Sequence, residues 1–439
     1  MKSFALSLLL PTFLFVANIK AQTVADPALL AEINKIRAVD NHAHPLGYLH
    51  DGEKDIDFDV PESVPPLVLP VRLRLTNREF IEAWRVLYGY KHNDFSEPHL
   101  RELAALKRRV MDAKGDSYPA WVLDKLGIEI MLANRTSLGR GHTPPRFRWV
   151  WYANELLFPL NNEEAKKSNP QREADFNTDE RWLKDLFTEF KLNGLPGTLN
   201  DYVKKLVLPA LEKRKREGAL AVKFYAAYMR SLEFADVSVS DASHVYAKYS
   251  NGVAPTASEY KALQDYLFRQ IALECGRLGL AVHIHVGIGA GGWFYTSTAN
   301  PELLDSVLND ARLRNTTFVL IHGGMPFTQV TKYLLNKPNV YVDFSAQTFL
   351  TSSRELSGVI RSWLEFTPEK VMFGTDAFPL TTAQGWEEIG WLSTKTARQA
   401  LAIALTGMIK DGEITRARAS ELARMVMRDN AIKLYGLRR

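Results

Sequence analysis

Residues 36–44 read IRAVDNHAH, and this stretch sets the expectation for the whole fold. An apolar, strand-like run is followed directly by two histidines that are two positions apart. In an extended strand, side chains two positions apart project from the same side. His42 and His44 are therefore expected to offer two neutral imidazole nitrogens to one divalent ion, and zinc is the commonest ion for such ligands.

Similar short apolar runs recur along the chain, and helical patterns lie between them. Most of these runs are continuously apolar, as strands buried on both faces of a parallel sheet are. Eight strands alternating with helices predict an α/β protein built as a (β/α)8 TIM barrel. The predicted strands are Ile36–Ala43, Ile128–Arg135, Phe147–Ala153, Leu220–Ala226, Leu280–Val286, Phe318–Gly323, Val340–Ser345 and Lys370–Asp376.

Two regions depart from this alternation. The stretch from Leu46 to Leu126 is far too long for a loop between a strand and a helix, and its second part is charged and helical in pattern. We expect it to be a helical insertion after strand 1, at about residues 46–126, that caps the mouth of the barrel. The tail from Trp386 to Arg439 predicts C-terminal helices that pack on the outside. The barrel domain is expected to span residues 22–439.

The amino terminus has the pattern of a secretory signal peptide over residues 1–21. Lys2 precedes an apolar run from Phe4 to Ala17, and the small Ala21 stands before the expected cleavage at Gln22. The run is short for a membrane span, which needs about 20 residues. We therefore expect a periplasmic or secreted protein that has no membrane attachment after cleavage.

Composition restricts the class of protein further. Of 439 residues, 46% are hydrophobic and 24% are charged, which excludes a disordered or fibrous chain. The net charge is +5, and the densest basic run, Lys213 to Arg216, is flanked by Glu212 and Glu217. This pattern is typical of a solvated helix face, so no nucleic-acid partner is expected. The single Cys275 excludes an internal disulfide and a thiolate zinc cluster.

Three further strands end in residues that carry chemistry. Residues 282–287 read VHIHVG, residues 320–324 read LIHGG and residues 372–377 read MFGTDA. The carboxyl ends of barrel strands form one face, and barrel enzymes build their active sites there. Buried polar groups at that face are costly unless they are satisfied. The convergence of five histidines and Asp376 therefore predicts a metal site.

Lys223 lies within the otherwise apolar strand sequence AVKFY, residues 221–225. A buried lysine needs a partner or a modification. It could contact substrate through its ammonium group, it could be carbamylated and bridge two metals, or it could pair with a carboxylate at a strand end. The sequence leaves these three alternatives open.

These motifs resemble those of the amidohydrolase superfamily, and more closely those of its "amidohydrolase 2" group. That group includes hydrolases, decarboxylases and barrel domains fused to glutamine-synthetase-like enzymes in fungi and plants. The resemblance covers nearly all of the chain after residue 21. It depends on His42-Ala43-His44 after strand 1, Lys223 on strand 4, His285 after strand 5, His322 after strand 6 and Asp376 after strand 8.

The resemblance implies that His42, His44, His285 and Asp376 bind the metal. It implies one Zn²⁺, or two ions if Lys223 is carbamylated, with Mn²⁺ or Fe²⁺ as alternatives. Asp376 is the expected general base, while His322 and Lys223 are expected to stabilise developing negative charge as catalytic residues.

Substrate contacts are expected from residues near the predicted strand ends. Arginine can hold a carboxylate through two parallel hydrogen bonds, so the arginines favour a small, carboxylate-bearing substrate, although ordinary ion pairs would explain them equally well. His283 is expected to contact substrate or to support the metal ligands. The other candidate substrate-binding residues are Arg135, Arg148, Arg230, Tyr228 and Trp293.

The sequence thus predicts an exported, metal-dependent hydrolase that cleaves a C–N or C–O bond of a small molecule. Two alternatives stay open. The same ligands could serve a non-oxidative decarboxylase, or the chain could be an inactive periplasmic protein that binds a metal or a solute. The partner is expected to be the substrate alone, and the sequence leaves a homo-oligomer open.

Overall fold

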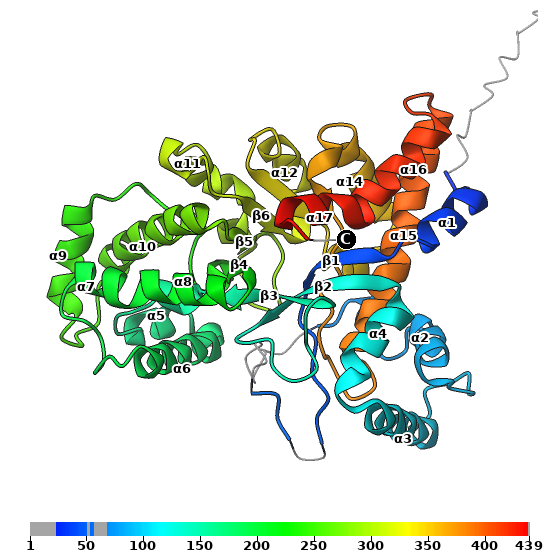
Figure 1. Cartoon of the computed structure of the whole chain (residues 1–439), viewed down its shortest axis with the longest axis horizontal. Coiled ribbons are helices and arrows are strands. Elements are labelled where there is room, and N and C mark those ends of the chain that lie inside the picture. Colours follow the sequence, from blue (N-terminus) through cyan, green and yellow to red (C-terminus); the bar gives the residue numbers. More distant parts are fainter. Residues whose placement is uncertain (1–22, 51–52, 57–67, 438–439) are drawn as a thin grey trace, which may run out of the picture.

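The computed structural model describes residues 23–50, 53–56 and 68–437 (Figure 1). The expected signal peptide, residues 1–21, lies outside them. Eight parallel strands form one sheet in chain order, which confirms the predicted (β/α)8 TIM barrel. The strands are β1 (Ala38–Ala43), β2 (Ile128–Arg135), β3 (Phe147–Tyr152), β4 (Ala219–Phe224), β5 (Ala281–His285), β6 (Phe318–Ile321), β7 (Val340–Asp343) and β8 (Val371–Met372).

Helices surround the strands and also fill the long connection between β1 and β2 (Figure 1). They are α1 (Pro27–Asn34), α2 (Glu79–Tyr88), α3 (Glu97–Lys114), α4 (Tyr118–Leu126), α5 (Glu163–Ser168), α6 (Glu173–Glu189), α7 (Leu199–Tyr202), α8 (Leu208–Arg216), α9 (Val239–Tyr249), α10 (Ala257–Leu278), α11 (Asp305–Leu308), α12 (Thr328–Leu334), α13 (Gln347–Leu350), α14 (Ser353–Leu364), α15 (Trp386–Lys410), α16 (Arg416–Arg424) and α17 (Asn430–Tyr435). Among the described residues, no helix is both long enough and apolar enough to cross a bilayer.

Backbone hydrogen bonds join the segment around β8 to β1 and so close the barrel. Asn41 N donates to Phe373 O at 3.0 Å, and His44 N donates to Ala377 O at 2.7 Å. The amide of Asp376 donates to His42 O at 2.7 Å. This closure brings the first and last strand-end motifs together, although they lie more than 300 positions apart in the chain.

The barrel has apolar side chains on both sides of its strands. Val222, Ile284 and Leu320 point outward into the core beneath the helices. Their strand neighbours Ala221 and Val319 point inward and form a smaller cluster with residues of β1, β2, β3 and β8. The pattern explains why the strands read as continuous apolar runs, since both faces are buried.

The helix α17 closes the amino end of the barrel, contrary to the expectation that the tail packs wholly on the outside. Ala431 and Leu437 belong to the inward-facing cluster, together with Val39, Ala221 and Ala281 from the first halves of β1, β4 and β5. The hydroxyl of Tyr435 donates to Asn41 Oδ1 at 2.6 Å and accepts from His283 Nε2 at 2.8 Å. Polar side chains deep in the barrel are thereby satisfied from its closed end.

The connection after β1 is held against β2 by a buried ion pair. Arg135 contacts both carboxylate oxygens of Asp55, with distances of 2.6 and 2.8 Å, and also donates to Pro45 O at 2.8 Å. His142 lies beside this pair, and its ring packs edge-on against Phe147 at 4.8 Å between centroids. Burial, together with the Arg135 guanidinium, lowers the pKa of His142 to about 3.

Replacing Tyr435 by Phe should destabilise the protein. The change leaves a buried N–H of His283 and a buried oxygen of Asn41 without their partner, which costs about 2 kcal/mol. Urea unfolding followed by circular dichroism measures the loss. Tyr333→Phe is the matched control, because Tyr333 is 66% exposed. Equal unfolding midpoints for Tyr435→Phe and the wild type would contradict the role assigned to this hydroxyl.

His142→Gln should make the protein less sensitive to acid. The pKa of His142 in the folded protein, about 3, lies below its usual value of 6.5. As pH falls below that usual value, His142 binds a proton in the unfolded chain but not in the folded protein, so the free energy of unfolding of the wild type decreases. Relative to the variant, the wild type should lose roughly 2–3 kcal/mol between about pH 7.5 and about pH 4.5. Denaturant unfolding at both values of pH measures the difference, and a constant difference would show that His142 is protonated in the folded protein.

Candidate metal centre

The carboxylate of Asp376 lies against the two histidines at the end of β1. Its Oδ1 is 3.1 Å from His42 Nε2 and 3.3 Å from His44 Nε2. Asn134 contacts Nδ1 of His42 at 2.8 Å, so Nε2 is the nitrogen that faces the carboxylate. Barrel closure between β8 and β1 positions this group, because the hydrogen bond from the Asp376 amide to His42 O joins the two segments.

Two of the site residues have a backbone conformation that L-residues seldom adopt. Asp376 has φ 53° and His322 has φ 70°. Neither residue is glycine, so these conformations persist only because the surroundings hold them. Next to Asp376, Thr375 donates to Asp40 from its amide at 2.9 Å and from its hydroxyl at 2.6 Å. Asp40 is buried, and burial raises its pKa to about 7.

His322 and His285 face each other through nitrogens that both carry lone pairs. His285 Nε2 donates to Ile288 O at 3.0 Å, so its Nδ1 is unprotonated. Ser345 Oγ donates its hydrogen to Asp343 Oδ1 at 2.6 Å and therefore accepts from His322 Nδ1 at 2.9 Å. His322 Nε2, left unprotonated, lies 3.1 Å from His285 Nδ1. Two such lone pairs repel each other unless they share a cation.

Burial keeps these imidazoles neutral. It lowers the pKa values of His42, His285 and His322 well below their usual range, and the nearby charge of Lys223 lowers them further. Neutral imidazole is the form that binds metal. Ligand atoms about 2.0–2.2 Å from one zinc ion lie roughly 3–3.5 Å apart, and the separations of 3.1–3.3 Å fit this spacing.

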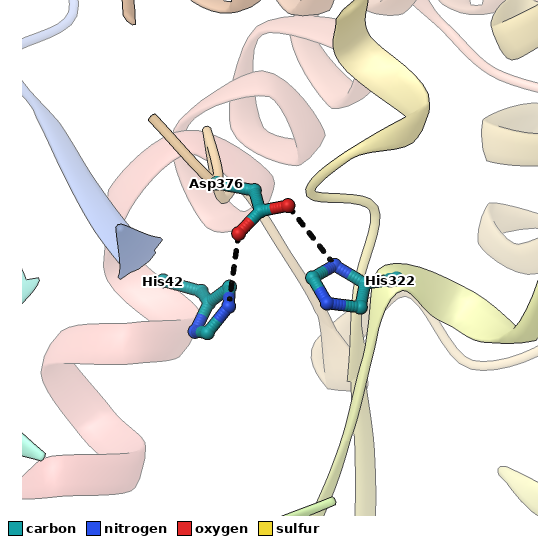
Figure 2. Close-up of side chains that lie close together, drawn as sticks. All are labelled: His42, His322 and Asp376. Atoms are coloured by element: carbon teal, nitrogen blue, oxygen red, sulfur yellow. Dashed lines mark ion pairs between the residues drawn. The ribbon is translucent and has the colours of Figure 1, made fainter. Parts of the chain in front are cut away.

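His42, His322 and Asp376 form one group of candidate ligands (Figure 2). One ligand atom from each residue lies within 4.8 Å of the other two. His44 joins the group through Asp376, and His285 joins it through His322. The structure thus brings all four predicted ligands together. It adds His322, to which the resemblance assigned a catalytic role.

Lys223 also lies at this site. Its Nζ is 3.4 Å from His42 Nε2, and the residue is 2% exposed. In the sheet, Lys223 of β4 is the register partner of His283 of β5, so it projects into the barrel interior. This position is compatible with each of the alternatives that the sequence left open, and the catalytic role of Lys223 stays a prediction.

Tyr228 lies beside the metal centre, as the sequence suggested for a substrate contact. Its ring centroid is 4.6 Å from that of His285, and burial raises the pKa of its hydroxyl. The sequence gave no signal for two of its neighbours, because neither follows a strand directly. The Arg172 guanidinium lies 4.6 Å over the Tyr228 ring and donates to Ala290 O. Phe294 packs edge-on against Tyr228 at 5.0 Å.

Two of the predicted substrate-binding arginines are instead held by other parts of the chain. Arg135 is 1% exposed and is bound to Asp55. Arg230 contacts Asp265 at 2.6 Å and also donates to Glu233 O at 2.7 Å. Their guanidinium groups are occupied by these internal contacts, so the structure does not support them as carboxylate clamps.

The remaining predictions of substrate contacts also need correction. Arg148 is the second residue of β3, at the amino end of the strand and therefore away from the metal centre. Trp293 is 69% exposed, and its neighbour Phe294 packs at the site in its place. His283 is hydrogen-bonded to Tyr435 in the barrel interior, so the structure does not support a substrate contact for it, and its alternative role beside the metal ligands stays a prediction.

Comparisons with known proteins agree with this fold and with the resemblance. The family model described as Amidohydrolase matches residues 244–437. Protein fluG of Emericella nidulans is 28% identical over 188 residues, which are 41% of this chain but only 20% of that protein. The chain therefore matches about a fifth of the length of this relative.

Solved structures share the barrel at low identity. A Lactobacillus casei protein described as a metal-dependent hydrolase has TM-score 0.62 and 16% identity over 94% of this chain and 98% of its own. Uronate isomerase from Thermotoga maritima has TM-score 0.59 and 16% identity over 83% and 79%. Glucuronate isomerase from Caulobacter crescentus has TM-score 0.55 and 14% identity over 94% of each chain. At these identities the matches show the fold, while the family match confirms the resemblance to amidohydrolases.

Ser345→Ala should weaken metal binding. The change removes the acceptor that holds His322 Nδ1–H, and loss of such supporting hydrogen bonds lowers metal affinity by roughly 10-fold or more. Competition with a chromogenic chelator measures the affinity. Ser357→Ala is the control, because the Ser357 hydroxyl donates to Arg354 O within its own helix. Unchanged affinity in Ser345→Ala would show that His322 does not bind the ion.

Proposed function

We propose that this chain is a metal-dependent hydrolase that cleaves a C–N or C–O bond of a small molecule. One observation carries the proposal: a carboxylate and four imidazoles converge at the carboxyl ends of the barrel strands. His42, His44, His285 and Asp376 would hold the ion, with His322 beside them. When bound, the ion, which we expect to be Zn²⁺ with Mn²⁺ or Fe²⁺ as alternatives, supplies Lewis acidity and lowers the pKa of a water molecule that it holds.

Asp376 would act as the general base. Its Oδ1 contacts His42 and His44, while its Oδ2 is 3.9 Å from His322 Nδ1. Its side chain is 15% exposed, against 0% for His42, so water can reach this carboxylate. Asp376 would take a proton from the attacking water and deliver it to the leaving group.

Lys223 would orient the substrate and stabilise negative charge, whereas His322, whose Nε2 is unprotonated, would join the ligands of the ion. Ser345 fixes the His322 ring, and the Lys223 ammonium is held in the barrel interior beside His42. Donors fixed in a buried site stabilise a developing oxyanion without reorganising. A single ion is proposed, and a second would require a carbamylated Lys223.

Decarboxylation is the second candidate reaction, because acid substrates can bind the same group of ligands through their oxygens. Assay of released carbon dioxide separates it from hydrolysis. We further propose export to the periplasm or the exterior, on the pattern of residues 1–21. An inactive binding protein would need no general base, so the position of Asp376 argues against that alternative.

Asp376→Asn should abolish most turnover and retain part of the metal. An amide cannot accept the proton, and loss of a general base costs roughly 100-fold or more in kcat. The zinc-loaded protein is assayed on a panel of N-acyl amino acids and lactones, with metal content measured alongside. Asp411→Asn is the control, because Asp411 is exposed and pairs with Arg361. Full turnover by metal-loaded Asp376→Asn would refute the assigned base.

A further inference from the structure

A cavity of about 450 Å³ lies between the helical insertion and the loop after β8. Its volume falls within the range of roughly 300–1000 Å³ that is typical of small-molecule sites. Its walls come from three segments: the connection after β1, the helix α3, and the chain between β8 and the start of α15. The apolar lining includes Leu46, Leu49, Ala104, Met111, Leu380 and Trp386.

Two residues that line this cavity lie a few positions along the chain from residues of the metal centre. Leu46 follows His44 by two positions, and Pro379 follows Asp376 by three. Because an extended chain advances at most about 3.6 Å per residue, Leu46 lies within about 7 Å of His44 and Pro379 within about 11 Å of Asp376, measured between Cα atoms. The cavity is therefore within reach of a ligand of moderate length that is bound at the metal centre.

The charged groups in the lining are already engaged: Glu387 accepts from the Tyr118 hydroxyl at 2.5 Å, and the two cations have partners as well. Lys107 donates to both oxygens of Glu388, at 2.9 and 3.0 Å. Arg108 donates to Leu49 O at 2.8 Å and pairs with Asp112. Since these cations are neutralised by the protein itself, the cavity offers an occupant mainly apolar surface.

We propose that this cavity binds the apolar part, alkyl or aryl, of the substrate whose reacting group lies at the metal centre. The proposal rests on the proposed function, because it assigns the cavity to the same substrate. The substrate is then an amphiphilic small molecule, with a polar, hydrolysable head and an apolar tail directed toward α3. Burial of that tail would supply binding energy that a short substrate lacks.

Alkyl hydroxamates of increasing length test this proposal on the zinc-loaded protein. The hydroxamate head binds divalent metal, and the tail is free to enter the cavity. Each buried methylene tightens binding roughly four-fold, so burial of three gives roughly 60-fold. Calorimetric titration should therefore find octanohydroxamate at least that much tighter than acetohydroxamate.

Two neighbouring alanines of α3 provide matched variants. Ala104 and Ala105 are both exposed, but of the two only Ala104 lines the cavity. Ala104→Trp should fill the cavity and remove most of the preference for octanohydroxamate, whereas Ala105→Trp should preserve it. Binding of acetohydroxamate should be unchanged in both variants.

The outcomes separate the two proposals. If acetohydroxamate binds but the longer tail adds nothing, or if Ala104→Trp keeps the preference, the cavity proposal is wrong and the metal site stands. If acetohydroxamate does not bind, or binds equally well without zinc, the metal site fails, and the cavity proposal fails with it.

Discussion

One constraint governs the site. A buried group of neutral imidazoles packs around one carboxylate, and these polar groups need an interaction that compensates for their burial. His42, His285 and His322 are removed from water, and burial lowers their pKa values well below the usual range, so they stay neutral near neutral pH beside the carboxyl group of Asp376. Such a group is costly to bury without compensation. A bound cation would satisfy the lone pairs and the carboxylate together, which is why this arrangement suits a metal better than a structural hydrogen-bond network.

Hydrogen bonds extend from this group through the whole barrel. Ser345 and Asp343 fix His322 at the mouth, and Asp343 accepts from Asn41 Nδ2 at 2.7 Å. Asn41 then accepts from Tyr435 of α17 at the closed end. The C-terminal helix is thereby linked to the metal centre by four successive side chains, so the end of the chain contributes to the geometry of ligands that lie far from it in sequence.

Much of this could be predicted from the sequence because the information is local. Apolar runs ending in polar residues identify the strands, and parallel strands in a barrel place all their carboxyl ends on one face. The sequence therefore predicts that six residues lie together: His42, His44, His285, His322, Lys223 and Asp376. Arginines near strand ends had no such constraint, because the partner of each one comes from a distant segment. Asp55 pairs with Arg135 and Asp265 pairs with Arg230, and neither pairing follows from periodicity.

The amino-acid sequence by itself determined the barrel and the identity of the residues at its mouth, since strand periodicity and the ends of strands are local properties. Only the tertiary structure decided which arginines are occupied, that His322 lies among the candidate ligands, that Phe294 and Arg172 adjoin Tyr228, and that α17 closes the opposite end. Those features depend on contacts between segments far apart in the chain, whose distances are set by packing and barrel closure and not by any local pattern.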